Sequence, residues 1–139
     1  MKEIEGNIWK FYPEYEIVIP TNGTVKRDGS CVMGRGLALQ AKKRFPELPF
    51  DVGNYILKFG NNTHRFAKYS IITFPVKHSW HEKADLNLIK ESARKLVIMV
   101  SWEVYLPEVG CGNGGRIWEE VKPILSELPD NFTVVHYKH

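Results

Sequence analysis

The chain has 139 residues, of which 43% are hydrophobic and 25% charged, a composition that predicts one globular domain over residues 1–139. The net charge of +3 allows an anionic ligand or a nucleic acid but requires neither. Two cysteines are too few for a disulfide framework, the apolar runs are too short to span a membrane, and no leader-like segment opens the chain, so we expect a cytoplasmic protein with reduced thiols.

The first half of the chain combines several predicted strands with one helix. Glu3–Trp9 alternates loosely, as an edge strand does, and Tyr15–Pro20 has the composition of a short buried strand. A glycine-punctuated loop leads to a predicted helix over residues 37–45, which a proline ends. Two further strands, Tyr55–Lys58 and Arg65–Phe74, are predicted on either side of a Gly-Asn-Asn turn.

The second half alternates strand, helix, strand, helix and strand. Asp85 is placed to cap a helix whose apolar stripe runs from residue 86 to residue 96. Strand Glu103–Leu106 follows, and then a helix that begins at Trp118 and that we expect Pro123 to kink or restart. A strand over residues 132–137 closes the chain. This order predicts a three-layer α/β domain with a largely parallel sheet, whose ligand lies beyond the carboxyl ends of the strands.

A glycine-rich loop after the Glu103–Leu106 strand is the strongest functional signal. Glycines let a backbone turn sharply and present bare N–H groups, and the start of a helix adds further donors. The loop matches neither the P-loop nor the dinucleotide-binding motif. It predicts a site for a phosphate or diphosphate, the alternative being a strand–helix connection without a ligand. Its central residues are Gly110, Cys111, Gly112, Asn113, Gly114 and Gly115.

Two other loops are expected at the same edge of the sheet. Asn22 follows one strand, and its amide suits sugar hydroxyls or, alternatively, an ordinary turn. Further along the same loop, Gly34, Arg35 and Gly36 open a helix. Lys77 follows another strand and is either a solvated lysine or, if desolvated among cations, a reactive amine. Histidines at 78 and 81 lack the further ligands that zinc needs, so we expect no metal or redox cofactor.

Taken together, these loops resemble those of a macrodomain, the ADP-ribose-binding fold. Gly6-Asn7-Ile8 resembles the segment that lies against adenine, Pro20-Thr21-Asn22 the segment that holds the distal ribose, and residues 110–115 the loop that wraps the diphosphate. The resemblance covers nearly the whole chain. It implies a macrodomain-like three-layer α/β/α sandwich with a mixed, largely parallel central sheet, and ADP-ribose or an ADP-ribosylated substrate as the partner.

One branch of the family is more similar. Residues 33–40, 43–46 and 74–80 resemble the macrodomain antitoxin that opposes DNA-ADP-ribosylating toxins, as do residues 112–115 with 118–123. The terminal ADP-ribose protein glycohydrolase is a more distant member of this branch. The resemblance implies that Lys77 is the catalytic residue and that Tyr137 stacks on adenine. The protein glycohydrolase has an aspartate where this chain has Gly114, and the family's usual acidic residue at adenine is replaced here by Asn7, which leaves more of the adenine selectivity to the backbone at Ile8.

The resemblance implies an ADP-ribosyl glycohydrolase that releases ADP-ribose from a nucleobase in DNA or from another acceptor. The acceptor stays open among thymidine, guanosine, a protein carboxylate and phosphate, and Lys77 acts either as a nucleophile or as a proton donor. The alternatives are a non-catalytic ADP-ribose reader, an ADP-ribose 1″-phosphate phosphatase, and a nucleic-acid-binding protein unrelated to ADP-ribose. We expect a monomer that acts as a standalone enzyme and not as an antitoxin that neutralises a toxin by contact.

Overall fold

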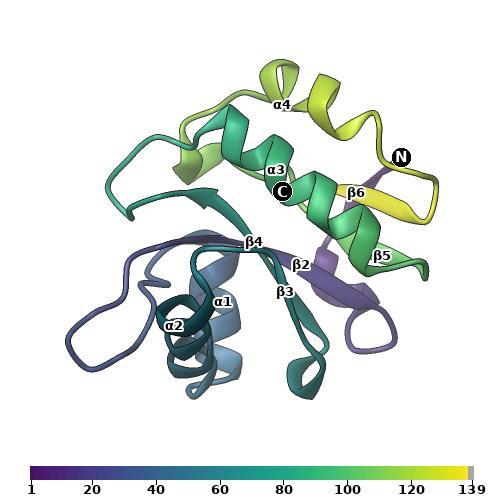
Figure 1. Cartoon of the computed structure of the whole chain (residues 1–139). Helices are drawn as coiled ribbons and strands as arrows, with labels where there is room; N and C mark the ends of the chain where they lie inside the picture. The colour runs from purple at the N-terminus through teal and green to yellow at the C-terminus, as the bar shows by residue number, and fades with distance from the viewer. Residues whose placement is uncertain (138–139) are drawn as a thin grey trace.

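The computed structural model describes residues 1–137, and within them lies a six-stranded sheet in the order β1-β6-β5-β2-β4-β3 (Figure 1). Neighbouring strands pair in parallel except for β3 and β4, which are antiparallel. The sheet is therefore mixed and largely parallel, as expected. The strands are β1 (Lys2–Gly6), β2 (Glu16–Asn22), β3 (His64–Phe66), β4 (Ile71–Lys77), β5 (Val104–Leu106) and β6 (Phe132–Tyr137).

Four α-helices cover the two faces of this sheet within the same residues. Figure 1 shows α1 and α2 on one face and α3 and α4 on the other, which confirms the three-layer α/β/α sandwich. Three short 3-10 segments join the layers at residues 8–11, 67–69 and 112–114. The helices are α1 (Gly36–Arg44), α2 (Leu48–Phe59), α3 (Leu86–Met99) and α4 (Trp118–Leu125).

The core consists of two clusters, one on each side of the sheet. Successive side chains of a strand point to opposite faces, so β2 sends Ile17 and Ile19 to the α1–α2 side and Val18 to the α3–α4 side. The buried strand β4 divides in the same way, with Ile71 on the first side and Phe74 on the second. Burial on both faces explains why these strands are nearly continuous apolar runs.

The helix ends follow the capping signals in the sequence. Helix α1 ends just before Phe45-Pro46, because a proline ring is incompatible with a continuing helix. Helix α3 begins after Asp85, whose side chain accepts hydrogen bonds from the backbone N–H groups of Asn87 and Leu88. Both predictions are confirmed. Helix α4 contains Pro123 and ends at Leu125.

The predicted strand at Tyr55–Lys58 is wrong, because these residues belong to α2. Val52 and Ile56 lie four residues apart and both pack against the α1–α2 side of the core, as the face of a helix requires. The aromatic content that suggested a strand serves another purpose, since the Tyr55 ring stacks on His64 of β3 at a centroid distance of 4.0 Å. The predicted hairpin turn at residues 60–62 instead follows the end of the helix.

Two other predicted strands are shorter than expected. The Glu3–Trp9 strand ends at Gly6 and gives way to a 3-10 turn over Ile8–Phe11. The Arg65–Phe74 strand is divided by a second 3-10 turn, Ala67–Tyr69, so that its halves become the antiparallel neighbours β3 and β4.

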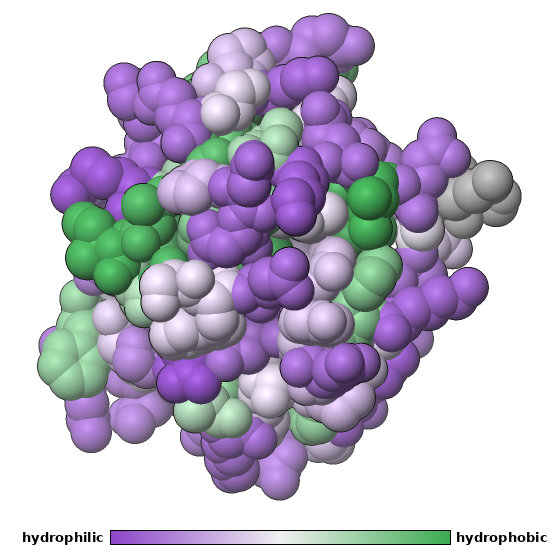
Figure 2. Space-filling model, turned by 90° about the vertical axis from the view of Figure 1, so that its right-hand side faces the viewer, coloured by the Kyte–Doolittle hydropathy of each residue, from purple (hydrophilic) through white to green (hydrophobic). Residues whose placement is uncertain are grey.

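The carboxyl ends of the five parallel strands share one edge of the sheet, at the left in Figure 1, where the loops after β2, β4 and β5 lie together. The view in Figure 2 faces the opposite edge, where the surface is mostly hydrophilic and the apolar residues form separate patches. Within residues 1–137, no helix combines the length and apolar character needed to cross a membrane.

Candidate functional site

The three loops at the carboxyl edge enclose a cavity of about 810 Å³. One wall comes from the loop after β2 and the start of α1, one from the loop after β4, and one from the glycine loop after β5. The cavity thus joins the three segments that the sequence singled out. The predicted site residues that line it are Asn22, Gly34, Arg35, Gly36, Lys77, Gly110, Cys111, Asn113, Gly114 and Gly115, whereas Asn7, Ile8, Gly112 and Tyr137 lie outside its lining.

The glycine loop is held in shape largely by its own backbone. Four of its N–H groups are engaged in internal hydrogen bonds, so fewer amides are bare than the glycine content indicates. Asn113 lines the cavity at the start of a one-turn 3-10 helix, where a residue's N–H has no partner within the turn. The internal donors are Cys111 N to Glu108 O (3.1 Å), Gly114 N to Cys111 O (3.3 Å), Gly115 N to Gly112 O (2.9 Å) and Arg116 N to Gly110 O (3.0 Å).

Gly110 is required at the base of this loop for two reasons. Its φ of +78° lies in the left-handed region that side chains disfavour. A Cβ at this position would also lie 2.6 Å from Cδ1 of Ile89 and 3.3 Å from Cβ of Ala84. The loop therefore packs directly onto α3 and the residue before its cap, and this contact fixes the height of the loop above the sheet.

Gly114 is the residue that the family resemblance matches to the aspartate of the protein glycohydrolase. It is buried, and its carbonyl accepts a hydrogen bond of 2.7 Å from the N–H of Ala84. A Cβ at Gly114 would lie 3.2 Å from Cβ of Ala84, a tight contact. The backbone here is thus packed for a residue without a side chain, which fits a site without a carboxylate at this point.

Lys77, the last residue of β4, extends across the cavity wall. Its Nζ lies 3.2 Å from the carbonyl oxygen of Trp80 and 3.2 Å from that of Asn113, and donates a hydrogen bond to each. The lysine side chain therefore joins the loop after β4 to the glycine loop. A lysine ammonium has three N–H donors, so one remains for a ligand in the cavity.

Asn22 lines the cavity and also braces its own loop. Its Nδ2 donates to the carbonyl of Val32 at 2.9 Å, and its Oδ1 accepts from the N–H of Thr24 at 3.0 Å. The Asn22 side chain therefore stabilises its own turn and also lines the cavity. An amide has two N–H groups and two lone pairs on oxygen, so one of each stays available to sugar hydroxyls.

The start of α1 gives the cavity a set of helix N–H donors. The residue at the cap position is Arg35, whose side chain makes no capping hydrogen bond. The first N–H groups of a helix have no acceptor within the helix and carry the positive end of its dipole. A Cβ at Gly36 would lie 3.2 Å from Nδ2 of Asn113, so this helix start directly faces the glycine loop.

The predicted adenine segment lies farther along the same edge, beyond β5. Gly6 pairs with Tyr137 across β1 and β6, which places Asn7 next to the end of β6. The Oδ1 of Asn7 accepts a hydrogen bond of 3.0 Å from the N–H of Trp9, and Ile8 is buried in the core. Ile8 can therefore offer a ligand only its backbone. Tyr137 is 64% exposed.

The cysteine in the glycine loop is unsuited to act as a nucleophile. Burial, followed by the charges of Glu108, Glu120 and Glu119, raises the pKa of Cys111 to about 11, so its thiol stays protonated at neutral pH. Burial likewise raises the pKa of Cys31 to about 12. Both cysteines are free.

The histidines after β4 do not form a metal centre with their neighbours. His78 Nε2 lies 2.8 Å from Oδ2 of Asp85, the cap of α3, and so ties the loop to the helix. Over residues 1–137, no group of three or more His, Cys, Asp or Glu side chains is arranged to hold a metal ion.

Several cavity residues were not among the sequence candidates. Trp80, His81, Glu82 and Lys83 line the mouth of the cavity from the loop after β4, and Glu108 lines it from the start of the glycine loop. Trp80 falls within the 74–80 segment that carries the family resemblance, and His81 was considered only as a metal ligand. The other three were marked only by a position near a strand end, which does not separate cavity residues from solvated loop residues.

No protein-family model matches the chain. Among curated proteins, the sequence is 32% identical over 123 residues to a DNA ADP-ribosyl glycohydrolase of Mycobacterium tuberculosis, a match that covers 76% of this chain and 35% of that protein. It is 30% identical over 142 residues to a protein of the same name from Thermus aquaticus, covering 91% of this chain and 37% of that protein. The chain thus spans about a third of the length of these relatives.

Solved structures show the same likeness. The macrodomain of Mycobacterium tuberculosis DarG superposes with a TM-score of 0.79 at 25% identity, over 99% of this chain and 97% of that one. The macrodomain of Thermus aquaticus DarG gives a TM-score of 0.67 at 25% identity, with the same coverage. The structure of Thermosipho africanus DarTG in complex with ADP-ribose shares the fold, with a TM-score of 0.76 at 20% identity over 98% of this chain and 41% of that one. The chain is therefore a macrodomain, similar in sequence and in structure to the DarG macrodomains.

Proposed function

We propose that this macrodomain binds ADP-ribose and hydrolyses the glycosidic bond between ADP-ribose and a nucleobase in DNA. The supporting relatives carry the name DNA ADP-ribosyl glycohydrolase, and a structure with the same fold was determined in complex with ADP-ribose. The observation that carries the proposal is the position of Lys77, whose Nζ contacts the glycine loop inside the cavity that Asn22 also lines.

In this proposal, the order of the strands determines how adenine, diphosphate and distal ribose follow one another along the carboxyl edge of the sheet. Along the carboxyl edge the sequence of strands is β1, β6, β5, β2 and β4. Adenine at β1 and β6 would place the diphosphate at the glycine loop after β5 and the distal ribose between Asn22 and Lys77, after β2 and β4. The cavity of about 810 Å³ lies within the usual range of small-molecule sites, about 300–1,000 Å³.

The diphosphate would be held by backbone donors on two sides. The uncapped start of α1 supplies helix N–H groups, and Asn113 supplies an N–H from the facing glycine loop. Arg35 at the cap position adds a positive charge beside them. Binding energy from this remote part of the substrate fixes the distal ribose, and fixing the reacting sugar is a main source of catalysis.

Hydrolysis breaks the bond between C1″ of the ribose and the base. As that bond breaks, its electron pair leaves with the base and C1″ becomes a cationic sugar, to which water adds as a hydroxyl group. In this proposal Lys77 donates a hydrogen bond and a proton to the departing base, and the proton released from water restores its charge. General acid catalysis of this kind contributes about 100- to 10,000-fold to a rate.

The test is the release of ADP-ribose from an oligonucleotide ADP-ribosylated on a base. We expect the wild-type protein to release ADP-ribose, and Lys77→Ala to lose about 100-fold or more of the rate while it keeps its affinity for free ADP-ribose. Lys90→Ala is the matched control, because Lys90 is exposed on α3 outside the cavity lining.

The outcomes separate this function from its alternatives. Tight binding of ADP-ribose without release from any acceptor identifies a reader, and release of phosphate from ADP-ribose 1″-phosphate identifies a phosphatase. Full activity of Lys77→Ala would refute the assigned role of the lysine.

A further inference from the structure

We propose that Trp80 is the platform on which the ADP-ribosylated nucleobase stacks, so that this side chain selects a base over a protein side chain as the acceptor. The inference rests on the proposed function, because it concerns the group attached to the distal ribose. It names a specificity residue that the sequence analysis did not identify.

Trp80 lies where that group must leave the cavity. Lys77 ends β4, the last of the parallel strands along the edge, and Trp80 follows in the loop beyond it. The carbonyl of Trp80 accepts a hydrogen bond of 3.2 Å from Nζ of Lys77, so its backbone touches the proposed catalytic group. A ligand that extends from β1 toward β4 therefore brings its distal end to Trp80.

Neighbouring residues cover the indole ring of Trp80 less than they cover the rings of the other three tryptophans. Trp9 and Trp102 each have an arginine over the ring, and Trp118 packs against the core. Trp80 lines the cavity yet is 54% exposed. Its one aromatic contact within residues 1–137 is edge-on, with His81 at an interplanar angle of 73°. A large apolar ring that lies at the mouth of a cavity, and is not packed against other residues, offers a surface for stacking.

The platform is also fixed in position before a ligand arrives. The N–H of Trp80 donates to Oγ1 of Thr24 at 3.0 Å, which ties the loop after β4 to the loop after β2. The far end of the loop is held by the N–H of Ala84, which donates to Gly114 O at 2.7 Å, and by the N–H of Asp85, which donates to Val76 O at 2.8 Å. Stacking on a ring whose backbone is already anchored costs little ordering entropy.

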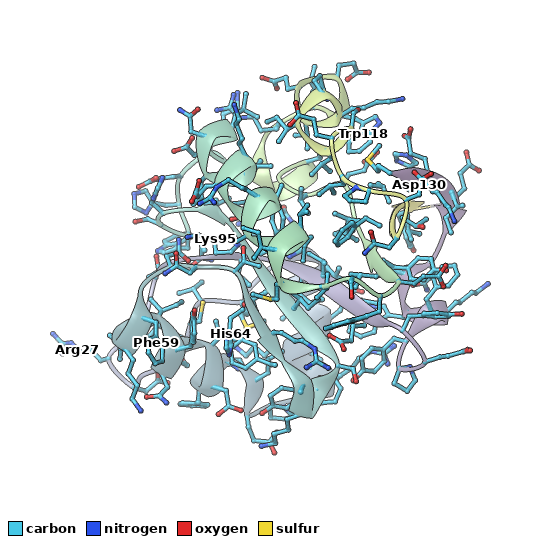
Figure 3. The ribbon with its side chains drawn as sticks, turned by 45° about the vertical axis from the view of Figure 1, so that its right-hand side comes forward. Arg27, Phe59, His64, Lys95, Trp118 and Asp130 are labelled. Atoms are coloured by element: carbon cyan, nitrogen blue, oxygen red, sulfur yellow. The ribbon has the colours of Figure 1, made fainter. Side chains whose placement is uncertain are left out.

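The charges at the cavity mouth agree with a nucleic acid acceptor. Lys83 lines the cavity from the same loop as Trp80, and Arg27 is exposed on the loop after β2, where Figure 3 shows it extending away from the molecule. These cations suit the phosphates on either side of a modified nucleotide. A base offers an aromatic ring for stacking on Trp80, whereas an acidic side chain that carries ADP-ribose as an ester offers none.

The test compares Trp80→Ala, Trp80→Phe and Trp102→Ala on three ligands: an oligonucleotide ADP-ribosylated on thymine, a peptide ADP-ribosylated on glutamate, and free ADP-ribose. We expect Trp80→Ala to raise KM for the oligonucleotide about 10-fold, with a smaller change in kcat, and Trp80→Phe to retain most of the wild-type value. Affinity for free ADP-ribose should stay within about twofold, because stacking acts only on the acceptor base. Trp102→Ala, which removes an exposed tryptophan at the opposite edge, should match the wild type.

A binding measurement keeps this proposal separate from the proposed function. In a Lys77→Ala background, the ADP-ribosylated oligonucleotide should bind more tightly than free ADP-ribose, and Trp80→Ala should reduce that difference about 10-fold even if the wild-type protein cleaves nothing. An unchanged difference in Trp80→Ala would overturn the platform. So would an equal loss of affinity for free ADP-ribose, or a loss of activity confined to the peptide substrate.

Discussion

The two ends of the carboxyl edge differ in how closely the protein surrounds its ligand site. At the β2–β4 end, Asn22 and Lys77 line a cavity, and the lysine is hydrogen-bonded to both neighbouring loops. At the β1–β6 end, Asn7 and Tyr137 are exposed and lie outside the lining of that cavity. Under the proposed function, this difference assigns the reaction to the enclosed end and the recognition of adenine to the open end.

The largest effect should come from Lys77→Met, which keeps the length of the side chain and removes its charge. We expect kcat to fall about 100- to 10,000-fold, with the Kd for ADP-ribose within about threefold of the wild type. Single-turnover release and calorimetry measure the two quantities. Lys90→Met should change neither, and a parallel loss of rate and affinity in Lys77→Met would erase the division between the two ends.

Gly110→Ala should test whether the base of the glycine loop is as tightly packed as the contacts indicate. The new Cβ would meet Ile89 on α3, and the backbone has a positive φ, so we expect the free energy of unfolding to fall by about 1–3 kcal/mol. Urea unfolding gives the value. Gly29→Ala is the matched control, because Gly29 also has a positive φ but no atom lies within 4 Å of its added Cβ. Equal losses in the two variants would mean that backbone strain, and not packing on α3, determines the effect.

Tyr137→Ala should act at the open end and leave the chemistry intact. If the ring stacks on adenine, its removal weakens the affinity for ADP-ribose about 10-fold, while kcat at saturating substrate stays close to the wild type. Tyr137→Phe should restore the affinity, since the ring is what stacks. A fall in kcat for Tyr137→Ala would show that the two ends are not separable.

The smallest effect concerns pH and a histidine at the open end. His136 Nε2 lies 2.8 Å from Oε1 of Glu3 in β1, and Nδ1 lies 2.7 Å from Oε1 of Glu108 at the cavity. Burial lowers the pKa of His136, but the hydrogen bonds and charges of the two glutamates outweigh it and raise the pKa above the ordinary 6.5. The folded state therefore favours the protonated ring.

This histidine should make the protein more stable in mild acid than in mild alkali. Its contribution is fully present below about pH 6.5 and is lost as the pH rises through the raised pKa of the folded state. The free energy of unfolding measured from about pH 6 to about pH 9 should decline more steeply in the wild type than in His136→Gln. Parallel profiles would contradict the assignment.

Much of the fold was predictable because local signals agreed with the tertiary structure. The helix after Asp85 has both a cap and an apolar stripe, and the strand before the glycine loop is continuous and apolar. The strand prediction for residues 55–58 failed because tyrosine and isoleucine favour strands locally, whereas the helical spacing becomes visible only when Val52 is included. Pro49 near the start and Gly60 at the end of α2 were usable signals for a helix.

The site was predictable in its backbone and less so in its side chains. Glycines and strand ends locate the cavity, because they reflect main-chain geometry. The hydrogen bonds that join Lys77 to Asn113, or Trp80 to Thr24, connect residues far apart in the chain and leave no mark in local sequence. For the same reason, the role of Trp80 at the cavity mouth emerges only from the three-dimensional arrangement.

The bridge that Lys77 makes between two loops has a consequence for turnover. Its Nζ is held by the carbonyls of Trp80 and Asn113, one on each side of the cavity mouth. The third N–H of the ammonium is left for a ligand, so a substrate can accept a hydrogen bond from Nζ while both loops stay tied to it. Under the proposed function, substrate entry and product departure then leave this bridge intact, and the two loops keep their positions from one turnover to the next.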